Sequence, residues 1–168
     1  GNFQNYLQII IDGVNTRIQT EGKYIVKDLS DGEHTLTIVK DTEANIGYIE
    51  FIGIRCTEIL DPDSLPEKRI EFIGNSITCG SGVENSQIAC ETGKWYDQHS
   101  AYQAYGPIAA RELNAQWMLS SFSGIGMIHS CCGRTEVISD IYEQVDLSVS
   151  GKAWEFSRYQ ADVVTICL

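Results

Sequence analysis

A change in sequence pattern near residue 61 most constrains what this chain can fold into. Two of its three prolines, Pro62 and Pro66, lie in the polar segment 61–66, which has no hydrophobic period. A proline pushes the residue before it toward extended backbone, and such segments are typical of turns and connections. The sequence therefore predicts a linker at 61–68 between two domains, residues 1–60 and residues 69–168.

Residues 1–60 have the pattern of short strands and tight turns. The apolar run from Tyr6 to Ile11 ends at Asp12-Gly13, which is a strong turn signal. This pattern predicts an antiparallel sheet that is part of a β-sandwich. Four strands would leave one apolar face uncovered, so further strands are expected before residue 1. The expected strands are Tyr6–Ile11, Lys23–Lys27, Glu33–Val39 and Tyr48–Arg55.

Residues 69–168 alternate between strand-like and helix-like segments, which predicts an α/β fold. Pro107 lies within the helix expected over residues 100–114, where it either kinks the helix or occupies its first turn. Asp162–Leu168 is so apolar that a central strand of a parallel sheet is expected, and a chain ending there is expected to be a fragment. The other expected elements are strands at Arg69–Ile73 and Trp117–Phe122 and a helix at Val137–Val145.

Charge and composition exclude several classes of protein. The chain has 168 residues with 12 Lys and Arg against 23 Asp and Glu, a net charge of −11. This balance argues against nucleic acid or an anionic membrane as a partner. No apolar run approaches the roughly 20 residues of a membrane span.

The six cysteines form no C-x-x-C pair, which disfavours a zinc ribbon or a thioredoxin site. Free or buried thiols are expected, or else a loop disulfide such as Cys79–Cys90. The adjacent Cys131 and Cys132 are not expected to pair with each other.

The segment I-E-F-I-G-N-S-I-T-C-G, residues 70–80, carries the strongest candidate for chemistry. A strand runs into a glycine, and Ser76 follows at the carboxyl edge, where open α/β sheets bind ligands. Backbone N–H groups and a helix start can stabilise an oxyanion there, so acyl transfer by Ser76 is a hypothesis that needs a base from elsewhere. The P-loop, G-x-G-x-x-G and G-x-S-x-G patterns are absent. The alternative is that Ser76 and Thr78 only cap a turn.

Several motifs in a fixed order resemble one family. The segment G-N-S-I-T-C-G-S-G, residues 74–82, resembles the first block of the SGNH (GDSL-type) hydrolases, in which the serine is the nucleophile. The chain is more similar still to carbohydrate esterase family 2, acetyl esterases that act on plant polysaccharides. The further matches are 31–36 and 40–44 to the family's N-terminal jelly roll, 104–106 and 109–111 to its first catalytic-domain helix, 123–126 to its second block, and 154–164 to the segment before its third.

This resemblance implies a partial jelly-roll β-sandwich followed by the N-terminal half of a flavodoxin-like, three-layer SGNH domain. It makes Ser76 the nucleophile and an oxyanion donor and Gly124 a second donor, with no metal or other cofactor. The family's third donor, an asparagine, and its catalytic histidine would follow Leu168. Asn75 departs from the aspartate that many SGNH enzymes have. His99 and His129 are weaker alternatives as the base.

The implied function is removal of O-acetyl groups from a polysaccharide such as xylan or mannan, by a secreted, periplasmic or cell-surface protein. Trp95 and Tyr96, in the long polar loop 83–99, are candidates for stacking on sugar rings or for packing the loop. Two alternatives remain open. One is a carbohydrate-binding or catalytically incomplete protein on the same scaffold, and the other is an SGNH esterase or lipase for another acyl ester.

Overall fold

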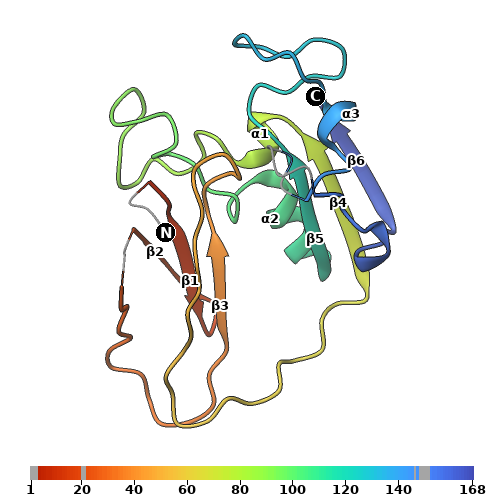
Figure 1. Cartoon of the computed structure of the whole chain (residues 1–168). Coiled ribbons are helices and arrows are strands. Elements are labelled where there is room, and N and C mark those ends of the chain that lie inside the picture. Colours follow the sequence, from red (N-terminus) through yellow and green to blue (C-terminus); the bar gives the residue numbers. More distant parts are fainter. Residues whose placement is uncertain (1–3, 20–21, 146, 148–151) are drawn as a thin grey trace.

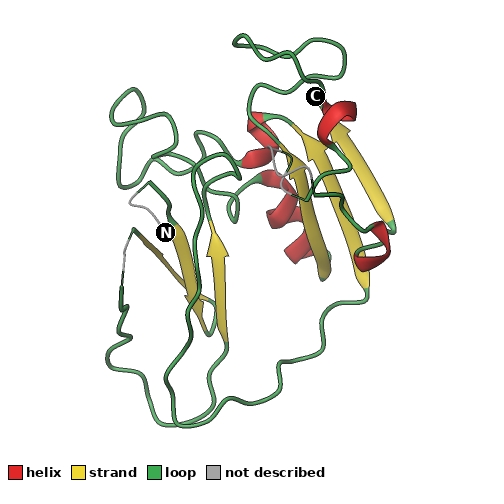
Figure 2. Cartoon of the chain, viewed as in Figure 1, coloured by secondary structure: helices red, strands yellow, loops and turns green. Residues whose placement is uncertain are grey.

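Two three-stranded sheets lie beside each other in the computed structural model (Figure 1). The structure describes residues 4–19, 22–145, 147 and 152–168. The first sheet has the strand order β2-β1-β3, and the second has the order β5-β4-β6. Long connections without regular structure make up much of the remainder (Figure 2).

The first sheet is antiparallel, with β1 (Leu7–Ile11) between β2 (Val14–Ile18) and β3 (Leu36–Lys40). The expected turn at Asp12-Gly13 joins β1 to β2, and both residues have positive φ, at 50° and 80°. A two-residue hairpin turn of this kind matches the twist of the strands that it connects. The predictions of β1 and β3 are therefore confirmed, whereas β2 is a strand that the sequence reasoning missed.

Two other predictions in this half are wrong. The segments 23–27 and 48–55 form no strand, and much of their apolar surface is exposed, with Tyr48 at 66% and Ile52 at 93%. Strand-like composition is not enough, because a strand also needs a neighbour with which to form backbone hydrogen bonds. These segments have no such neighbour in the described structure.

The second sheet is parallel, with β4 (Lys68–Gly74) between β5 (Ala115–Ser121) and β6 (Val163–Cys167). All three strands match predictions. Gly74 is in register with both Ser121 and Cys167, so the carboxyl ends of the strands meet at one edge. The apolar β6 is an edge strand in the described sheet rather than the expected central strand, and Ile166 is 60% exposed.

Helices cover both faces of the parallel sheet. α2 (Tyr105–Glu112) begins later than the predicted helix, and Pro107 lies in its first turn, where a missing N–H costs no hydrogen bond. α3 is much shorter than predicted, Ile138–Ile141 instead of 137–145. The remaining helical pieces are α1 (Ser76–Cys79) and the 3₁₀ turn η1 (Phe156–Arg158).

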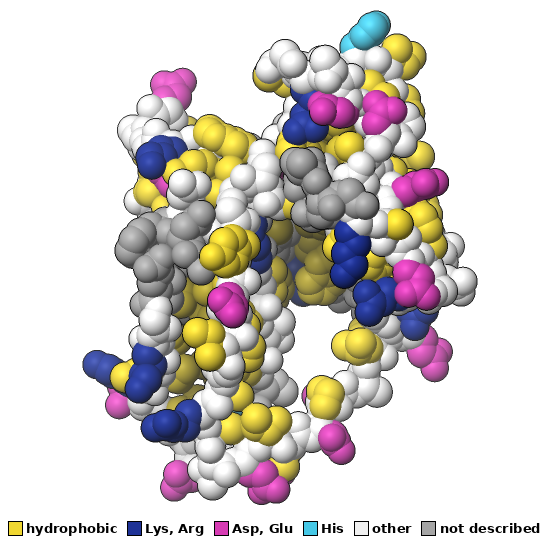
Figure 3. All heavy atoms as spheres, in the orientation of Figure 1, with side chains coloured by type: hydrophobic (Ala, Val, Ile, Leu, Met, Phe, Trp, Pro, Cys, Tyr) yellow, Lys and Arg dark blue, Asp and Glu magenta, His cyan; other side chains and the backbone are white. Residues whose placement is uncertain are grey.

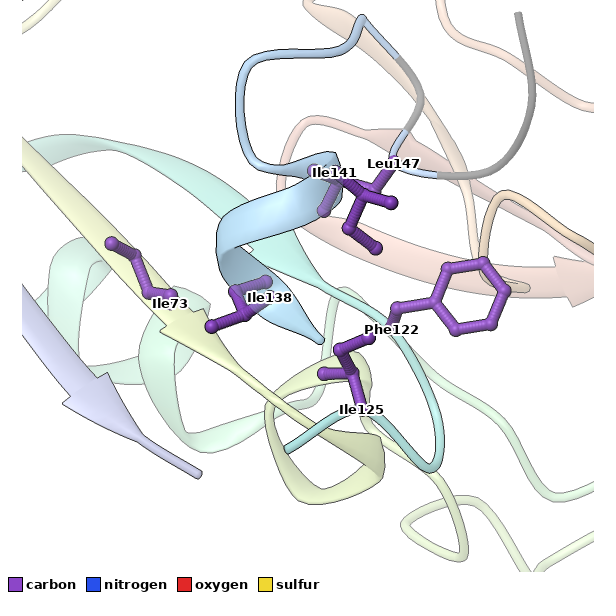
Figure 4. Close-up of a cluster of buried hydrophobic side chains, with 6 residues drawn as sticks. All are labelled: Ile73, Phe122, Ile125, Ile138, Ile141 and Leu147. Carbon is purple, nitrogen blue, oxygen red and sulfur yellow. The ribbon is translucent and has the colours of Figure 1, made fainter. Parts of the chain in front are cut away.

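Successive side chains of β4 point to opposite faces of the sheet, and this divides the core into two clusters. Ile70 and Phe72 pack with Ala110 of α2, while Ile73 faces the opposite side of the sheet. Figure 4 shows the second cluster, in which side chains of β4, α3 and the chain after β5 converge. Its six members are Ile73, Phe122, Ile125, Ile138, Ile141 and Leu147. This cluster anchors the segment that follows β5 at the carboxyl edge of the sheet.

A buried carboxylate joins the two halves of the molecule. Asp41, directly after β3, is fully buried and accepts hydrogen bonds from Gln8 Nε2 at 2.6 Å and Ser100 Oγ at 2.9 Å. Arg17 Nε lies 3.2 Å from the same carboxylate, and the Arg17 guanidinium also donates to the carbonyl of His99 at 2.9 Å. The loop that precedes α2 is thereby held against the first sheet.

The surface carries mixed side chains, with apolar groups exposed over both halves (Figure 3).

The predicted linker is an irregular, largely exposed segment up to the start of β4. None of the helices in the described part of the chain has the length and apolarity required to cross a membrane.

Candidate functional site

Ser76 is the first residue of α1, two positions after the end of β4. The turn from strand to helix is tight at Gly74. A Cβ atom at this position would lie 2.7 Å from the carbonyl oxygen of Cys167 and closer still to the Thr78 side chain. Thr78 is fully buried, and its hydroxyl lies 3.1 Å from the Tyr105 hydroxyl of α2. Ser76 therefore stands on a closely packed support at the carboxyl edge of the sheet.

Asn75 holds the start of α1. Its Oδ1 accepts a hydrogen bond from the N–H of Ile77 at 3.1 Å, which is the N-cap geometry. The departure from aspartate at this position thus leaves the capping acceptor in place. α1 has only four residues, so the helix dipole that the sequence suggested as a stabilising charge is small.

The Ser76 side chain is half-buried and points to no recorded partner within the described ranges. Neither its hydroxyl nor its backbone N–H forms a hydrogen bond to any residue there. The alternative that Ser76 caps the turn is not what the structure shows, because Asn75 provides the cap. A polar group without an internal partner at a sheet edge is available to a ligand.

Gly124 lies in the turn after β5 and has a φ of 81°, which strongly favours glycine. The backbone amides of the two residues that follow it are occupied. The N–H of Ile125 donates to the carbonyl of Phe122 at 3.2 Å, and the N–H of Gly126 donates to Ser130 Oγ at 3.1 Å. The N–H of Gly124 is the one amide between 122 and 126 without a partner in the described part of the chain.

The sheet register brings Ser76 and Gly124 to the same edge. Ser121, at the end of β5, is opposite Gly74, and the N–H of Phe122 donates to the carbonyl of Gly74 at 3.1 Å. Beneath them, Cys79 Sγ donates to Ser121 Oγ at 3.3 Å. The two residues that the sequence singled out for chemistry thus follow paired positions on adjacent parallel strands.

Glu43 is a buried member of this region that the sequence reasoning missed. Its Oε2 accepts a hydrogen bond from the N–H of Ser123 at 3.0 Å, although Glu43 belongs to the first half of the chain. Burial is the main cause that raises the pKa of the Cys79 thiol, and the negative charge of Glu43 adds to it. A thiolate nucleophile at Cys79 is therefore unfavourable. A buried glutamate within the polar run K-D-T-E-A gives no local sign of its partner.

The two aromatic residues of the long loop have different environments. Trp95 is 52% exposed, whereas Tyr96 is buried at 8% exposure. The Trp95 ring packs edge-on against His99, with ring centroids 4.7 Å apart. Trp95 therefore keeps exposed surface, whereas the burial of Tyr96 favours packing within the loop.

His99, one of the two weaker alternatives for the base, is fully buried. Both of its ring nitrogens lack hydrogen-bond partners among the described residues. Burial lowers its pKa, and the nearby Glu43 charge partly opposes this effect. A ring enclosed in this way is poorly suited to exchange protons with a bound substrate. His129 is exposed on the loop after Gly124.

The cysteines do not form the loop disulfide that was considered. Cys79 is buried and free, and Cys90 is exposed and free. The adjacent Cys131 and Cys132 are joined, contrary to expectation, where the backbone turns sharply through a φ of 64° at Cys132. No group of three or more potential metal ligands occurs within the described ranges.

The sequence and the structure of the chain are similar to those of known carbohydrate esterases. The profile of the carbohydrate esterase 2 N-terminal family matches residues 1–62. The cellulase/esterase CelE of Acetivibrio thermocellus is 34% identical over 98% of the chain, which spans 21% of that protein. The structure of a family two carbohydrate esterase from Clostridium thermocellum, in complex with cellohexaose, superposes over 96% of the chain with a TM-score of 0.83 and 34% identity.

The chain belongs to carbohydrate esterase family 2. It spans about half of the matching solved structure, 51% of that chain. It likewise spans 48% of an acetylxylan esterase / glucomannan deacetylase of Cellvibrio japonicus, to which it is 28% identical over 97% of its own length. The helix-flanked parallel sheet of this family 2 chain is consistent with part of an SGNH-type domain.

Proposed function

We propose that this chain supplies the nucleophile and two oxyanion donors of a carbohydrate acetyl esterase. The observation that carries the proposal is the pair of unpartnered groups at the carboxyl edge of the parallel sheet. These are the Ser76 hydroxyl after β4 and the Gly124 N–H after β5. Preorganised amides of this kind typically contribute about 3–4 kcal/mol each to transition-state stabilisation.

The proposed reaction has two steps. In the first, Ser76 Oγ forms a bond to the acetyl carbonyl carbon while its proton passes to a general base. The oxyanion accepts hydrogen bonds from the N–H groups of Ser76 and Gly124, and the sugar oxygen leaves with the proton. In the second, water attacks the acetyl-serine, and acetate and the free serine hydroxyl are released.

The general base is the part of this mechanism that the described residues do not supply. His99 is enclosed, and its neutral form is favoured by burial, but it has no access to a substrate. By family resemblance, the base is a histidine that follows Leu168. Activity is therefore measured in the full-length protein.

An acetylated plant polysaccharide, such as xylan or mannan, is the proposed substrate. Relatives named as deacetylases support an enzyme over the alternative of a purely carbohydrate-binding protein. The exposed ring of Trp95 is a candidate platform for a sugar face. We also propose that residues 1–60 are part of a jelly-roll domain, that 61–68 link it to the SGNH domain at 69–168, and that the protein acts outside the cytoplasm.

Ser76→Ala tests the proposed function. Acetate release from acetylated xylan should fall at least about 10³-fold, because no other hydroxyl occupies this position. Ser81→Ala is the matched control, since Ser81 is also half-buried and follows α1 at the end distant from Asn75. The control should retain wild-type activity.

The proposal would be overturned if Ser76→Ala released acetate at the wild-type rate while remaining folded. Aryl esters of increasing acyl length test the acetyl assignment separately. Activity on long acyl chains alone would indicate a lipid or small-ester substrate instead.

A further inference from the structure

We propose that Glu43 is a positioning residue for the oxyanion hole. It acts by holding the backbone of Ser123, so that the N–H of the next residue, Gly124, faces the reacting carbonyl. This inference rests on the proposed function of Gly124 as a donor. It assigns a role in catalysis to a side chain from the first, non-catalytic half of the chain.

The contact is direct and largely buried. Glu43 Oε2 accepts the Ser123 N–H at 3.0 Å, and the Glu43 side chain is 7% exposed. Its second oxygen, Oε1, has no hydrogen-bond partner among the described residues. The carboxylate also interacts with the buried Cys79 thiol, but its hydrogen bond from Ser123 is the contact that reaches the Gly124 turn, from a residue 80 positions away in the sequence.

Glu43 is itself held in place by its own backbone. Its carbonyl accepts hydrogen bonds from Lys40 Nζ at 2.6 Å and from the N–H of Ile46 at 3.1 Å. Two residues earlier, Asp41 is locked into the buried network with Gln8 and Ser100. The carboxylate thus projects from a fixed turn after β3 rather than from a mobile loop.

The bonding pattern around Gly124 explains why this contact matters. The amides of residues 122, 123, 125 and 126 each have a described acceptor, and those acceptors determine the direction in which the remaining N–H points. Three of the acceptors lie in the parallel-sheet half, on residues 74, 122 and 130. Glu43 alone reaches the turn from the first sheet. Without it, the Ser123 peptide loses its partner and the turn can rotate.

Four variants of Glu43 test this role in the full-length protein. Gln retains an oxygen acceptor at the same reach, Asp retains the charge but is one methylene shorter, and Ala removes both. We expect kcat on an aryl acetate to fall at least about tenfold in Glu43→Ala and Glu43→Asp, with KM changed less than twofold. Glu43→Gln should retain kcat within about threefold of wild type. Glu43→Gln combined with Ser76→Ala should show no activity above Ser76→Ala.

Glu50→Ala and Glu50→Gln are matched controls, because Glu50 is an exposed glutamate seven residues further along the same segment. Both should have wild-type kcat. The expected order of kcat is wild type, then Glu43→Gln, then Glu43→Asp and Glu43→Ala. This order separates hydrogen bonding from charge, because a purely electrostatic role would give Glu43→Asp a higher kcat than Glu43→Gln. If Glu43→Ala fails to fold, the comparison of Gln with Asp decides the question.

A kcat for Glu43→Ala or Glu43→Asp equal to that of wild type would overturn the inference, and so would a loss confined to KM. The backbone amide resonance of Ser123 provides a readout independent of activity. It should shift upfield in Glu43→Ala and Glu43→Asp and stay near its wild-type position in Glu43→Gln. If Glu43→Ala shows this shift but the wild-type protein has no deacetylase activity, the proposed function is contradicted. If the wild type is active and Glu43→Ala produces no shift, only the role of Glu43 is contradicted.

Discussion

The antiparallel sheet β2-β1-β3 and the parallel sheet β5-β4-β6 use their polar side chains differently. In the parallel half, the candidate reactive groups follow strand ends and have free hydrogen-bonding capacity, as at Ser76 and Gly124. In the antiparallel half, Asp41 and Glu43 are buried and bind groups of the other half. The comparison indicates that one sheet presents the chemistry and the other fixes the loops around it.

The two halves also differ in how their cores are built. β4 is buried on both faces along most of its length by the two clusters that contain α2 and α3. The strands β2 and β3 are largely exposed. The first half is held to the second through hydrogen bonds of Asp41, Arg17 and Glu43, and the first two of these form a buried ion pair within the first half. The first half should therefore respond most to the loss of a buried charge and the second to a change in volume.

The largest effect on stability is expected from Asp41→Ala. This change leaves the buried Arg17 guanidinium without its carboxylate and removes the acceptor for Gln8 and Ser100. Removing one partner of a buried ion pair typically costs about 3–5 kcal/mol. Urea denaturation should show a loss of this size. Asp63→Ala, in the exposed linker, should change the free energy of unfolding by less than about 0.5 kcal/mol.

A smaller but still clear loss is expected from Gly74→Ala. The added methyl group would lie 2.7 Å from the Cys167 carbonyl, so β4, β6 or α1 must shift. Overpacking of this kind costs about 1–3 kcal/mol. The matched control is Gly53→Ala in the first half, where a Cβ meets nothing within 4 Å and the expected change is close to zero. Equal stabilities of the two variants would contradict the close packing under Ser76.

The smallest effect is a dependence on pH that originates in the antiparallel half. Burial lowers the pKa of Lys40 to about 8, partly opposed by the charge of Glu43. The unfolded chain keeps Lys40 protonated up to its ordinary pKa, so between about pH 8 and that value the unfolded state binds more protons. Stability from this group therefore rises with pH across that window.

Lys40→Met isolates this contribution. The stability of the wild type relative to Lys40→Met should increase by about 1–2 kcal/mol between pH 7 and pH 10, after allowance for partial solvent screening. Thermal unfolding of both proteins across this range measures the difference. A difference that is constant with pH would show that Lys40 is not desolvated in the folded protein.

Prediction from sequence succeeded in the parallel half of the molecule and failed in part of the antiparallel half. Each strand of the parallel sheet was predicted, because a long apolar run between glycines and polar segments has few alternatives to a buried strand. In the first half, 23–27 and 48–55 have a similar composition but no partner, and the prediction failed there. The short hairpin strand β2 was missed, since its pairing depends on the turn at Asp12-Gly13 rather than on its own apolar content.

The amino-acid sequence by itself determined the local parts of the site. These are a strand that ends in glycine, a serine two residues after that glycine, a capping residue between them, and a second glycine turn after the next strand. Such features depend on the conformational limits of neighbouring residues, and these are written in the chain. Only the tertiary structure decided that Glu43 meets Ser123, that Asp41 meets Ser100, and that His99 is enclosed. Burial and long-range hydrogen bonds arise when distant segments pack together, so the type of a single residue does not predict them.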